Sequence, residues 1–174
     1  MALTYDIAKE LLHGTVGGHK FYMRAFSGGG RGKKAKYGVG EQTLTSRLST
    51  TVADEKEGKR GGPLPPGEYI CTYVAHHTTF HECIHLRTTL SSRYIASPVA
   101  RFPIWHGRPK DGDFYIHGRG KLGSDGCIVP EVDAARVGLN KAVKKCPGTE
   151  LTVINASYML SAELEPGLGS SEVV

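Results

Sequence analysis

The sequence predicts a mostly β domain of the β-rich α+β class, and three observations support this prediction. The chain has 174 residues, which is near the usual size of one compact domain. Its 23 glycines and 9 prolines indicate many turns between short strands. Runs rich in β-branched and aromatic residues recur between these turns, whereas only one or two stretches have helical periodicity. A hydrophobic fraction of 39% and a charged fraction of 22% are typical of a folded globular protein.

The expected elements follow in order along the chain. Apolar residues at four-residue steps predict a short amphipathic helix over residues 3–12. Alternating residues predict a strand over 20–26. A cluster of glycine and proline at 61–67 forms a rigid turn, and a strand is expected to follow it at 68–75. Further short strands are expected at 82–90, 102–106, 113–117 and 150–156.

One clear helix is expected over about residues 131–145. It begins after a proline and places Val132, Ala135, Leu139 and Val143 on one side. Two lysines end it, and a Pro-Gly pair follows, which is a common way for a helix to stop. The helix is therefore the main exception in a chain of short strands and turns.

The formal net charge of +5 favours an anionic partner such as nucleic acid, an acidic membrane surface or a cell-wall polymer. No window approaches the 18 or so uninterrupted apolar residues of a transmembrane helix, so such a helix is not expected. Asp6, Lys9 and Glu10 interrupt any apolar stretch near the N-terminus, so no secretory signal is predicted. The chain is accordingly expected to be made in the cytoplasm.

The cysteines are too few for a disulfide scaffold and include no C-x-x-C pair: Cys71, Cys83, Cys127 and Cys146. A cytosolic chain keeps them reduced at first, so at least one is a candidate for chemical activity. A second cluster of possible metal ligands consists of His76, His77, His81, Cys83 and His85. On a strand, three of these share one face that could hold zinc, but no second ligand pair appears elsewhere. A half-exposed strand or hairpin is the favoured interpretation.

The most informative segment runs from Phe114 to Val129, with the sequence FYIHGRGKLGSDGCIV. An apolar strand leads into His117, a glycine-rich loop follows, and Cys127 stands ten residues further on. A thiol is a weak nucleophile until it loses its proton, which a nearby imidazole can accept. The glycines allow the loop to fold back, and backbone N–H groups near Cys127 could face an oxyanion. The alternative interpretation is a buried structural cysteine beside a turn-forming histidine.

Two stretches of this segment, Ile116-His117-Gly118 and Gly123-Ser124-Asp125-Gly126-Cys127-Ile128, resemble the active-site signature of the L,D-transpeptidase (YkuD-like) family. Members of that family are cysteine enzymes that act on peptidoglycan stem peptides. The patterns AFSG at 25–28 and GPLPPGEY at 62–69 extend the resemblance to the small L,D-transpeptidase-like antibacterial effectors of type VI secretion systems. The resemblance covers about residues 20–156, which leaves 1–19 as an N-terminal segment and 157–174 as a C-terminal tail. It implies a YkuD-like β-sandwich or barrel with one or two short helices.

The resemblance also implies an activity, namely L,D-carboxypeptidase cleavage or D-amino-acid exchange on tetrapeptide stems, with no metal or organic cofactor. Cys127 would be the nucleophile and His117 the base, with His106, 21 residues before Cys127, as the alternative base. Ser124 would shape the loop or orient the imidazole, and backbone amides around Gly126 would form the oxyanion hole. The expected substrate-binding residues are Arg119, Lys121, His106 and Tyr115.

The chain departs from the wall-building members of the family at Asp125, where they carry histidine. It also has Ile128 and Val129 where they tend to have arginine or asparagine, so it is expected to read stem peptides differently. The effector branch implies a toxin that acts in the periplasm of a target cell, with a secretion component and an immunity protein as partners and no nucleic acid. The alternatives are a basic, non-enzymatic binding module for nucleic acid or glycan, and a housekeeping cell-wall L,D-transpeptidase.

Overall fold

The computed structural model describes residues 2–28, 64, 67–88, 114–118, 124 and 126–154, which form a closed β-barrel and one α-helix. This confirms the prediction of a mostly β fold. The expected strand at 102–106 lies outside the described residues, whereas the other expected strands are present within a few residues of their expected bounds. The elements are β1 (Ala2–Asp6), β2 (Leu11–Val16), β3 (His19–Ser27), β4 (Gly67–His77), β5 (His81–Thr88), β6 (Phe114–Ile116), β7 (Ile128–Pro130), α2 (Asp133–Lys145) and β8 (Thr149–Ile154).

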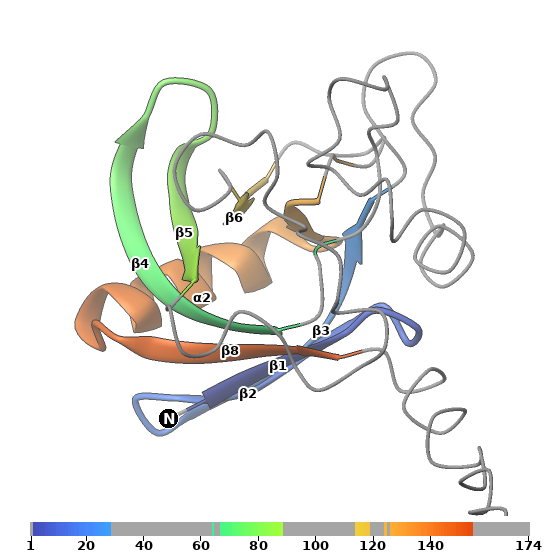
Figure 1. Cartoon of the computed structure of the whole chain (residues 1–174). Helices are drawn as coiled ribbons and strands as arrows, with labels where there is room; N and C mark the ends of the chain where they lie inside the picture. The colour runs from blue at the N-terminus through green and yellow to red at the C-terminus, as the bar shows by residue number, and fades with distance from the viewer. Residues whose placement is uncertain are drawn as a thin grey trace, which may run out of the picture.

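The barrel has the strand order β1-β2-β3-β7-β6-β5-β4-β8 and closes between β8 and β1 (Figure 1). Six of its neighbouring pairs are antiparallel, and two, β1–β8 and β6–β7, are parallel. Closure gives each of the described strands a neighbour on both sides. The parallel β6–β7 pair joins the two ends of the segment that carries the sequence motif.

The expected helix over residues 3–12 is wrong, because this segment forms β1, a turn and the start of β2. Leu3, Tyr5 and Ile7 are all buried, so the four-residue spacing that suggested a helix also belongs to a two-residue alternation. The Asp6 carboxylate ends β1 by accepting hydrogen bonds from the backbone N–H groups of Ala8 (3.1 Å) and Lys9 (3.3 Å). Pairing with β8 then decides in favour of a strand.

The barrel includes the first residues of the chain. The domain was expected to begin at residue 20, and β1 and β2 precede that point while pairing with β8 and β3. Leu3, Tyr5 and Leu12 join the same hydrophobic core as residues of β4, β5, β6 and β8, namely Tyr69, Leu86, Ile116 and Leu151. Two strands of the barrel therefore come from the segment that was placed before the domain.

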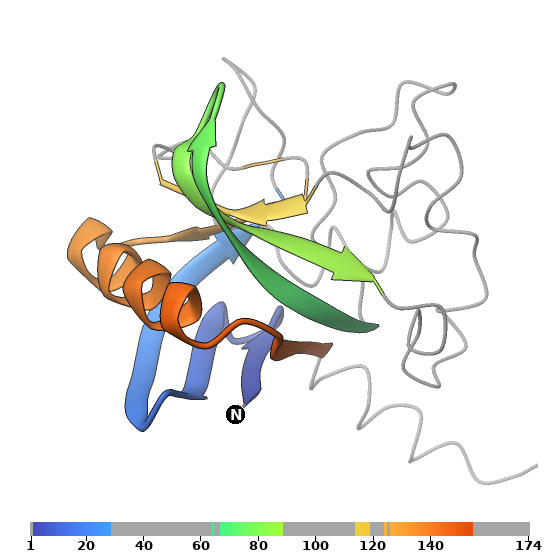
Figure 2. The same cartoon turned by 90° about the vertical axis from the view of Figure 1, so that its left-hand side faces the viewer.

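The expected helix at about 131–145 is confirmed as α2, which starts two residues later than expected. It packs against β2, β3 and β7 on one side and β4 and β5 on the other. In Figure 2 it lies between the β2–β3 hairpin and the β4–β5 hairpin. Leu139, Ala142 and Val143 on its inner face belong to the hydrophobic core. Within the described residues of the chain, no helix is long and apolar enough to cross a membrane.

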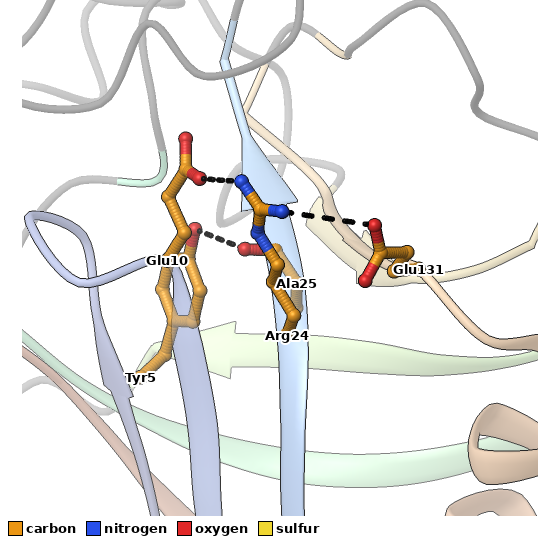
Figure 3. Close-up of polar contacts among 5 residues, drawn as sticks. All are labelled: Tyr5, Glu10, Arg24, Ala25 and Glu131. Carbon is orange, nitrogen blue, oxygen red and sulfur yellow. Dashed lines mark hydrogen bonds and ion pairs between the residues drawn. The ribbon is translucent and has the colours of Figure 1, made fainter.

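The turn after β1 is joined to β3 and to the end of β7 by an arginine with two carboxylate partners (Figure 3). Arg24 donates to Glu10 at 3.2 Å and lies 3.8 Å from the carboxylate of Glu131. Beneath it, the buried hydroxyl of Tyr5 donates to the carbonyl of Ala25 at 3.3 Å. Because the ion pairs are partly exposed, they contribute little energy, and the buried Tyr5 bond is the firmer link.

We expect replacement of Gly14 with alanine to destabilise the barrel strongly, by about 2–3 kcal/mol. Gly14 has φ +142°, and an added Cβ would lie 2.3 Å from the carbonyl oxygen of Ala2 and 2.9 Å from Cα of Leu3. These are backbone atoms of the paired strand β1, so they cannot move without opening the pair. Thermal or urea unfolding measures the effect.

The matched control is Gly18→Ala. Gly18 also has a left-handed φ of +81°, but an added Cβ would meet nothing within 4 Å. Only the conformational cost, about 1 kcal/mol, is expected there. Equal losses of stability in the two variants would contradict the close approach of β1 and β2 at Gly14.

Candidate active site

The β6–β7 pair brings the two ends of the motif together. Ile116 pairs with Ile128 in parallel, and the N–H of His117 donates to the carbonyl of Ile128 at 3.1 Å. Cys127 immediately precedes Ile128, so the backbone of His117 is hydrogen-bonded to the residue next to the cysteine. His117 directly follows β6 and Cys127 directly precedes β7, so the pairing of Ile116 with Ile128 brings the two residues close along the backbone.

His117 is held in one tautomer by its neighbour. Its side chain is buried, and Nδ1 lies 2.6 Å from the carbonyl oxygen of Gly118. A carbonyl can only accept, so Nδ1 carries the hydrogen and Nε2 of the neutral ring has the free lone pair. The Gly118 carbonyl thus orients the ring as the third group of a nucleophile–base–orienter arrangement does.

The environment of His117 favours its neutral form. Burial lowers the pKa of His117 below its ordinary value and outweighs the hydrogen bond to Gly118, which acts in the opposite direction. The charges of Arg136 and His77 lower the pKa of His117 further. An imidazole that is neutral near pH 7 with Nε2 unprotonated can accept a proton from a thiol.

Side chains of helix α2 pack against Gly118, whose carbonyl orients the ring of His117. A Cβ added at Gly118 would lie 2.7 Å from Nε of Arg136 and 3.0 Å from Oδ1 of Asp133, so only glycine fits this contact without displacing them. Arg136 donates through Nε to Asp133 at 2.9 Å and through Nη1 to the carbonyl of Glu82 at 3.3 Å. The guanidinium therefore ties the start of α2 to β5 and packs directly against Gly118.

Ser124 fixes the backbone of Cys127. Its hydroxyl donates to the carbonyl of Cys127 at 2.6 Å and accepts the N–H of Gly28 at 3.3 Å. Its own N–H donates to the carbonyl of Gly28 at 2.9 Å. Both of these contacts of the Ser124 hydroxyl run to backbone atoms.

Ser27 holds the preceding residue of the loop in the same manner. Its buried hydroxyl donates to the carbonyl of Gly126 at 3.1 Å and accepts the N–H of Leu64 at 2.7 Å. Gly126 has φ +113°, a value that side chains rarely tolerate, so glycine is required for this turn into Cys127. The carbonyls on both sides of the Cys127 N–H are thereby held by serine hydroxyls.

We expect Ser124→Ala to lower stability by about 2 kcal/mol, because it leaves the buried N–H of Gly28 and the carbonyl of Cys127 without this partner. Chemical denaturation measures the loss. Thr72→Ser, on the exposed face of β4, is the control and should change stability by less than about 0.5 kcal/mol. A loss no larger than that of the control would contradict the role of Ser124 in the loop.

A cluster of rings covers His117 on the outer side. The ring of Phe80 stacks on the imidazole of His117 with centroids 3.8 Å apart and planes 7° apart. Phe80 also stacks on His77 at 4.7 Å, and His77 meets Tyr115 edge-on at 4.7 Å. Tyr115 in turn stacks on His85 at 4.9 Å. Tyr115, expected to bind substrate, thus lies in the same cluster as the predicted base.

The histidine cluster that was weighed as a zinc site forms the end of β4 and the start of β5, the hairpin that was favoured instead. Across the described residues, no group of three or more His, Cys, Asp or Glu side chains is placed to hold a metal ion. Cys83 is buried in the sheet, whereas His77 and His85 join the ring cluster around Tyr115. These contacts describe ring packing rather than ligation.

The four cysteines are free thiols in different environments. Burial raises the pKa of Cys71 to about 12 and that of Cys83 to about 11, so both stay protonated and unreactive near neutral pH. Cys146 is half-buried at the end of α2. Cys127 differs from all three because Ser124 holds its carbonyl and the following residue, Ile128, accepts a hydrogen bond from the backbone of His117.

Of the predicted site residues, the structure brings together Cys127, His117, Ser124 and Gly126, with Tyr115 in the adjoining ring cluster. The remaining predicted positions lie outside the described residues: Arg119, Lys121, His106 and Asp125. Residues of the site that received no role from the sequence are Ser27, Phe80, Asp133 and Arg136, and His77 was considered only as a metal ligand. Ser27 stands in the AFSG pattern that contributed to the resemblance, whereas the others have no local signal.

Comparison of the chain with protein-family models, with curated proteins and with solved structures returned no match.

Proposed function

We propose that this protein is a cysteine-dependent peptidoglycan enzyme that acts on tetrapeptide stems, with Cys127 as nucleophile and His117 as base. The observation that carries this proposal is the hydrogen bond from His117 Nδ1 to the Gly118 carbonyl, which leaves Nε2 as the acceptor of a ring whose backbone is bonded to Ile128, the residue after Cys127. The resemblance to the L,D-transpeptidase family supplies the substrate class and the YkuD-like identity of the barrel.

In the proposed reaction, the thiol of Cys127 gives its proton to Nε2 of His117, and the sulfur attacks the carbonyl of the diaminopimelate–D-alanine bond. The C–N bond then breaks, and the imidazolium protonates the departing amine of D-alanine. A thioester remains on Cys127. Water resolves it in the carboxypeptidase reaction, and a D-amino acid resolves it in the exchange reaction, with His117 accepting the proton of the attacking group.

The loop contacts support an oxyanion site at the Gly126–Cys127 peptide. Serine hydroxyls engage the carbonyls of Gly126 and Cys127, which fixes the orientation of the peptide between them. A fixed N–H is what an oxyanion hole requires, because it stabilises the developing charge without reorganising. Arg119 and Lys121, between His117 and Ser124 in the sequence, are the proposed partners of the stem carboxylates.

Incubation with purified muropeptides and mass analysis of the products tests the proposal. Tetrapeptide stems are expected to lose D-alanine, and added D-amino acids are expected to appear in exchanged stems. If the folded protein leaves tetrapeptides unchanged, the proposal fails. A basic binding module would instead bind anionic polymers with an affinity that falls steeply with salt and survives Cys127→Ala.

The proposed biological role is that of an antibacterial toxin acting in the target periplasm, delivered by type VI secretion and neutralised by an immunity protein. This role rests on the resemblance to the effector branch. Expression with a periplasmic leader should arrest growth and expression without one should not, while Cys127→Ala should be harmless in both places. Growth arrest by the Cys127→Ala variant in the periplasm would argue against a toxic enzymatic activity.

A further inference from the structure

We propose that Phe80, at the tip of the β4–β5 hairpin, is a positioning residue that holds the imidazole of His117 in the plane and tautomer required of a base. This inference rests on the proposed function for its meaning. Its geometric content can be tested separately, because the state of the His117 ring is measurable without any substrate.

Two contacts act on the His117 ring in different directions. The hydrogen bond from Nδ1 to the Gly118 carbonyl fixes which edge of the ring points toward the backbone. The ring of Phe80 lies parallel to the imidazole at 3.8 Å, with an angle of 7° between the planes. A half-turn of the imidazole would sweep its edge through the space that Phe80 fills. Such a half-turn would put Cδ2 in the place of Nδ1, so Phe80 blocks the movement that would take Nδ1 away from the Gly118 carbonyl.

The hairpin tip that carries Phe80 is itself locked by a histidine. Nδ1 of His77 accepts the backbone N–H groups of Thr79 and Phe80, both at 3.1 Å. His81 closes the turn with φ +58°, and the ring of His77 stacks on that of Phe80 at 4.7 Å. The position of Phe80 is thus set by the backbone of the turn as well as by ring packing.

Phe80 also contributes to the burial of the base. Burial is the main cause of the lowered pKa of His117, and the face of Phe80 covers one side of its ring. The charged and titratable groups that act on His117 from the packed elements are Arg136 of α2 and His77 of β4. Both disfavour the imidazolium. Because Phe80 buries one face of the ring, we expect its removal to admit water and to move the pKa of His117 back toward its ordinary value.

The test compares Phe80→Leu with Phe80→Tyr in the full chain, using NMR of ¹⁵N-labelled histidine side chains. In the wild type and in Phe80→Tyr, the His117 ring protons should be shifted upfield by the stacked ring, and the nitrogen shifts should report hydrogen on Nδ1. In Phe80→Leu, the upfield shift should vanish, both tautomers should be populated, and the pKa of His117 should rise.

The kinetic readout follows the same variants on muropeptides. Phe80→Leu should lower kcat by about 10- to 100-fold with little change in KM, and Phe80→Tyr should retain most of kcat. If the wild type has no activity, the proposed function fails while the NMR comparison still decides the role of Phe80. Unchanged ring-proton shifts, tautomer and pKa of His117 in Phe80→Leu would overturn the inference.

A second pair of variants covers the case in which Phe80→Leu does not fold. His77→Asn retains a side-chain acceptor for the turn amides, and His77→Ala removes it. We expect His77→Ala to weaken the upfield shift of the His117 protons and His77→Asn to preserve it. An upfield shift that is equally strong in both variants would contradict the proposed path from the turn to Phe80.

Discussion

Replacement of Cys127 with alanine is expected to abolish D-alanine release while the barrel remains folded. The sulfur is the only heavy atom removed, and the carbonyl of Cys127 accepts a hydrogen bond from the hydroxyl of Ser124. Without a nucleophile no thioester can form, so turnover should fall at least about 10⁴-fold, beyond the contribution of any single acid–base group. Mass analysis of muropeptides measures the activity, and circular dichroism measures the fold.

Cys146→Ala is the matched control for this variant. Cys146 is half-buried at the end of α2, away from the β6–β7 pair, and its replacement should leave D-alanine release within about twofold of the wild type. Cys127→Ser should also lose most of the activity, because a hydroxyl has a much higher pKa than a thiol and is a weaker nucleophile in a site arranged around sulfur. Retained activity in Cys127→Ala would refute Cys127 as the nucleophile.

The same assignment predicts the order of thiol alkylation in the native protein. Iodoacetamide at about pH 7 should label Cys127 first, because the lowered pKa of His117 leaves its ring neutral there and able to accept the proton of this thiol. Cys71 and Cys83 should stay unlabelled, since burial raises their pKa values to about 12 and about 11. If Cys127 reacts no faster than Cys71 or Cys146, the proton transfer to His117 is contradicted.

The fold could be predicted from the sequence wherever the signal is local. Alternation within 20–26 and the proline-glycine turn before β4 predicted two strands, and the apolar face with its terminal lysines predicted α2. The helix expected over residues 3–12 was wrong because the spacing of Leu3 and Ile7 fits both the four-residue step of a helix and the two-residue alternation of a strand. The deciding interaction is the parallel pairing of β1 with β8, which lies near the other end of the chain and leaves no local trace.

The candidate site likewise contains residues that the local sequence predicts and residues that it does not. The glycines between His117 and Cys127 predicted that the ends of this segment meet, and Ile116 does pair with Ile128. The pair is parallel, so it is not the direct fold-back between strands that the glycines suggested. Phe80 and Arg136 could not be found from the sequence, because each approaches His117 or Gly118 only through the β5–β6 and α2 packing. The AFSG pattern pointed to Ser27, but its hydrogen bond to Gly126 depends on the pairing of β3 with β7.

Replacement of His117 with asparagine is the second change with a large expected effect. The asparagine amide can still donate to the Gly118 carbonyl, so the loop should keep its shape while the proton acceptor is lost. We expect kcat to fall by about 10²- to 10⁴-fold with a much smaller change in KM. His19→Asn, on the exposed start of β3, is the control and should be fully active. Equal kcat in His117→Asn and the wild type would leave the base unassigned and favour His106.

The pH dependence gives an independent check on the same residue. Because burial lowers the pKa of His117, the ring loses its proton at a lower pH in the folded chain than in the unfolded chain. The unfolded state therefore binds more protons below about pH 6.5, and the stability of the wild type should fall as pH decreases through that range. In His117→Asn this contribution to the pH dependence should disappear, as measured by urea unfolding at several pH values. The acid limb of kcat for the wild type should likewise lie below the ordinary histidine value, because Nε2 must be unprotonated to accept the thiol proton. A limb above that value would mean that His117 is protonated more easily than its buried position allows.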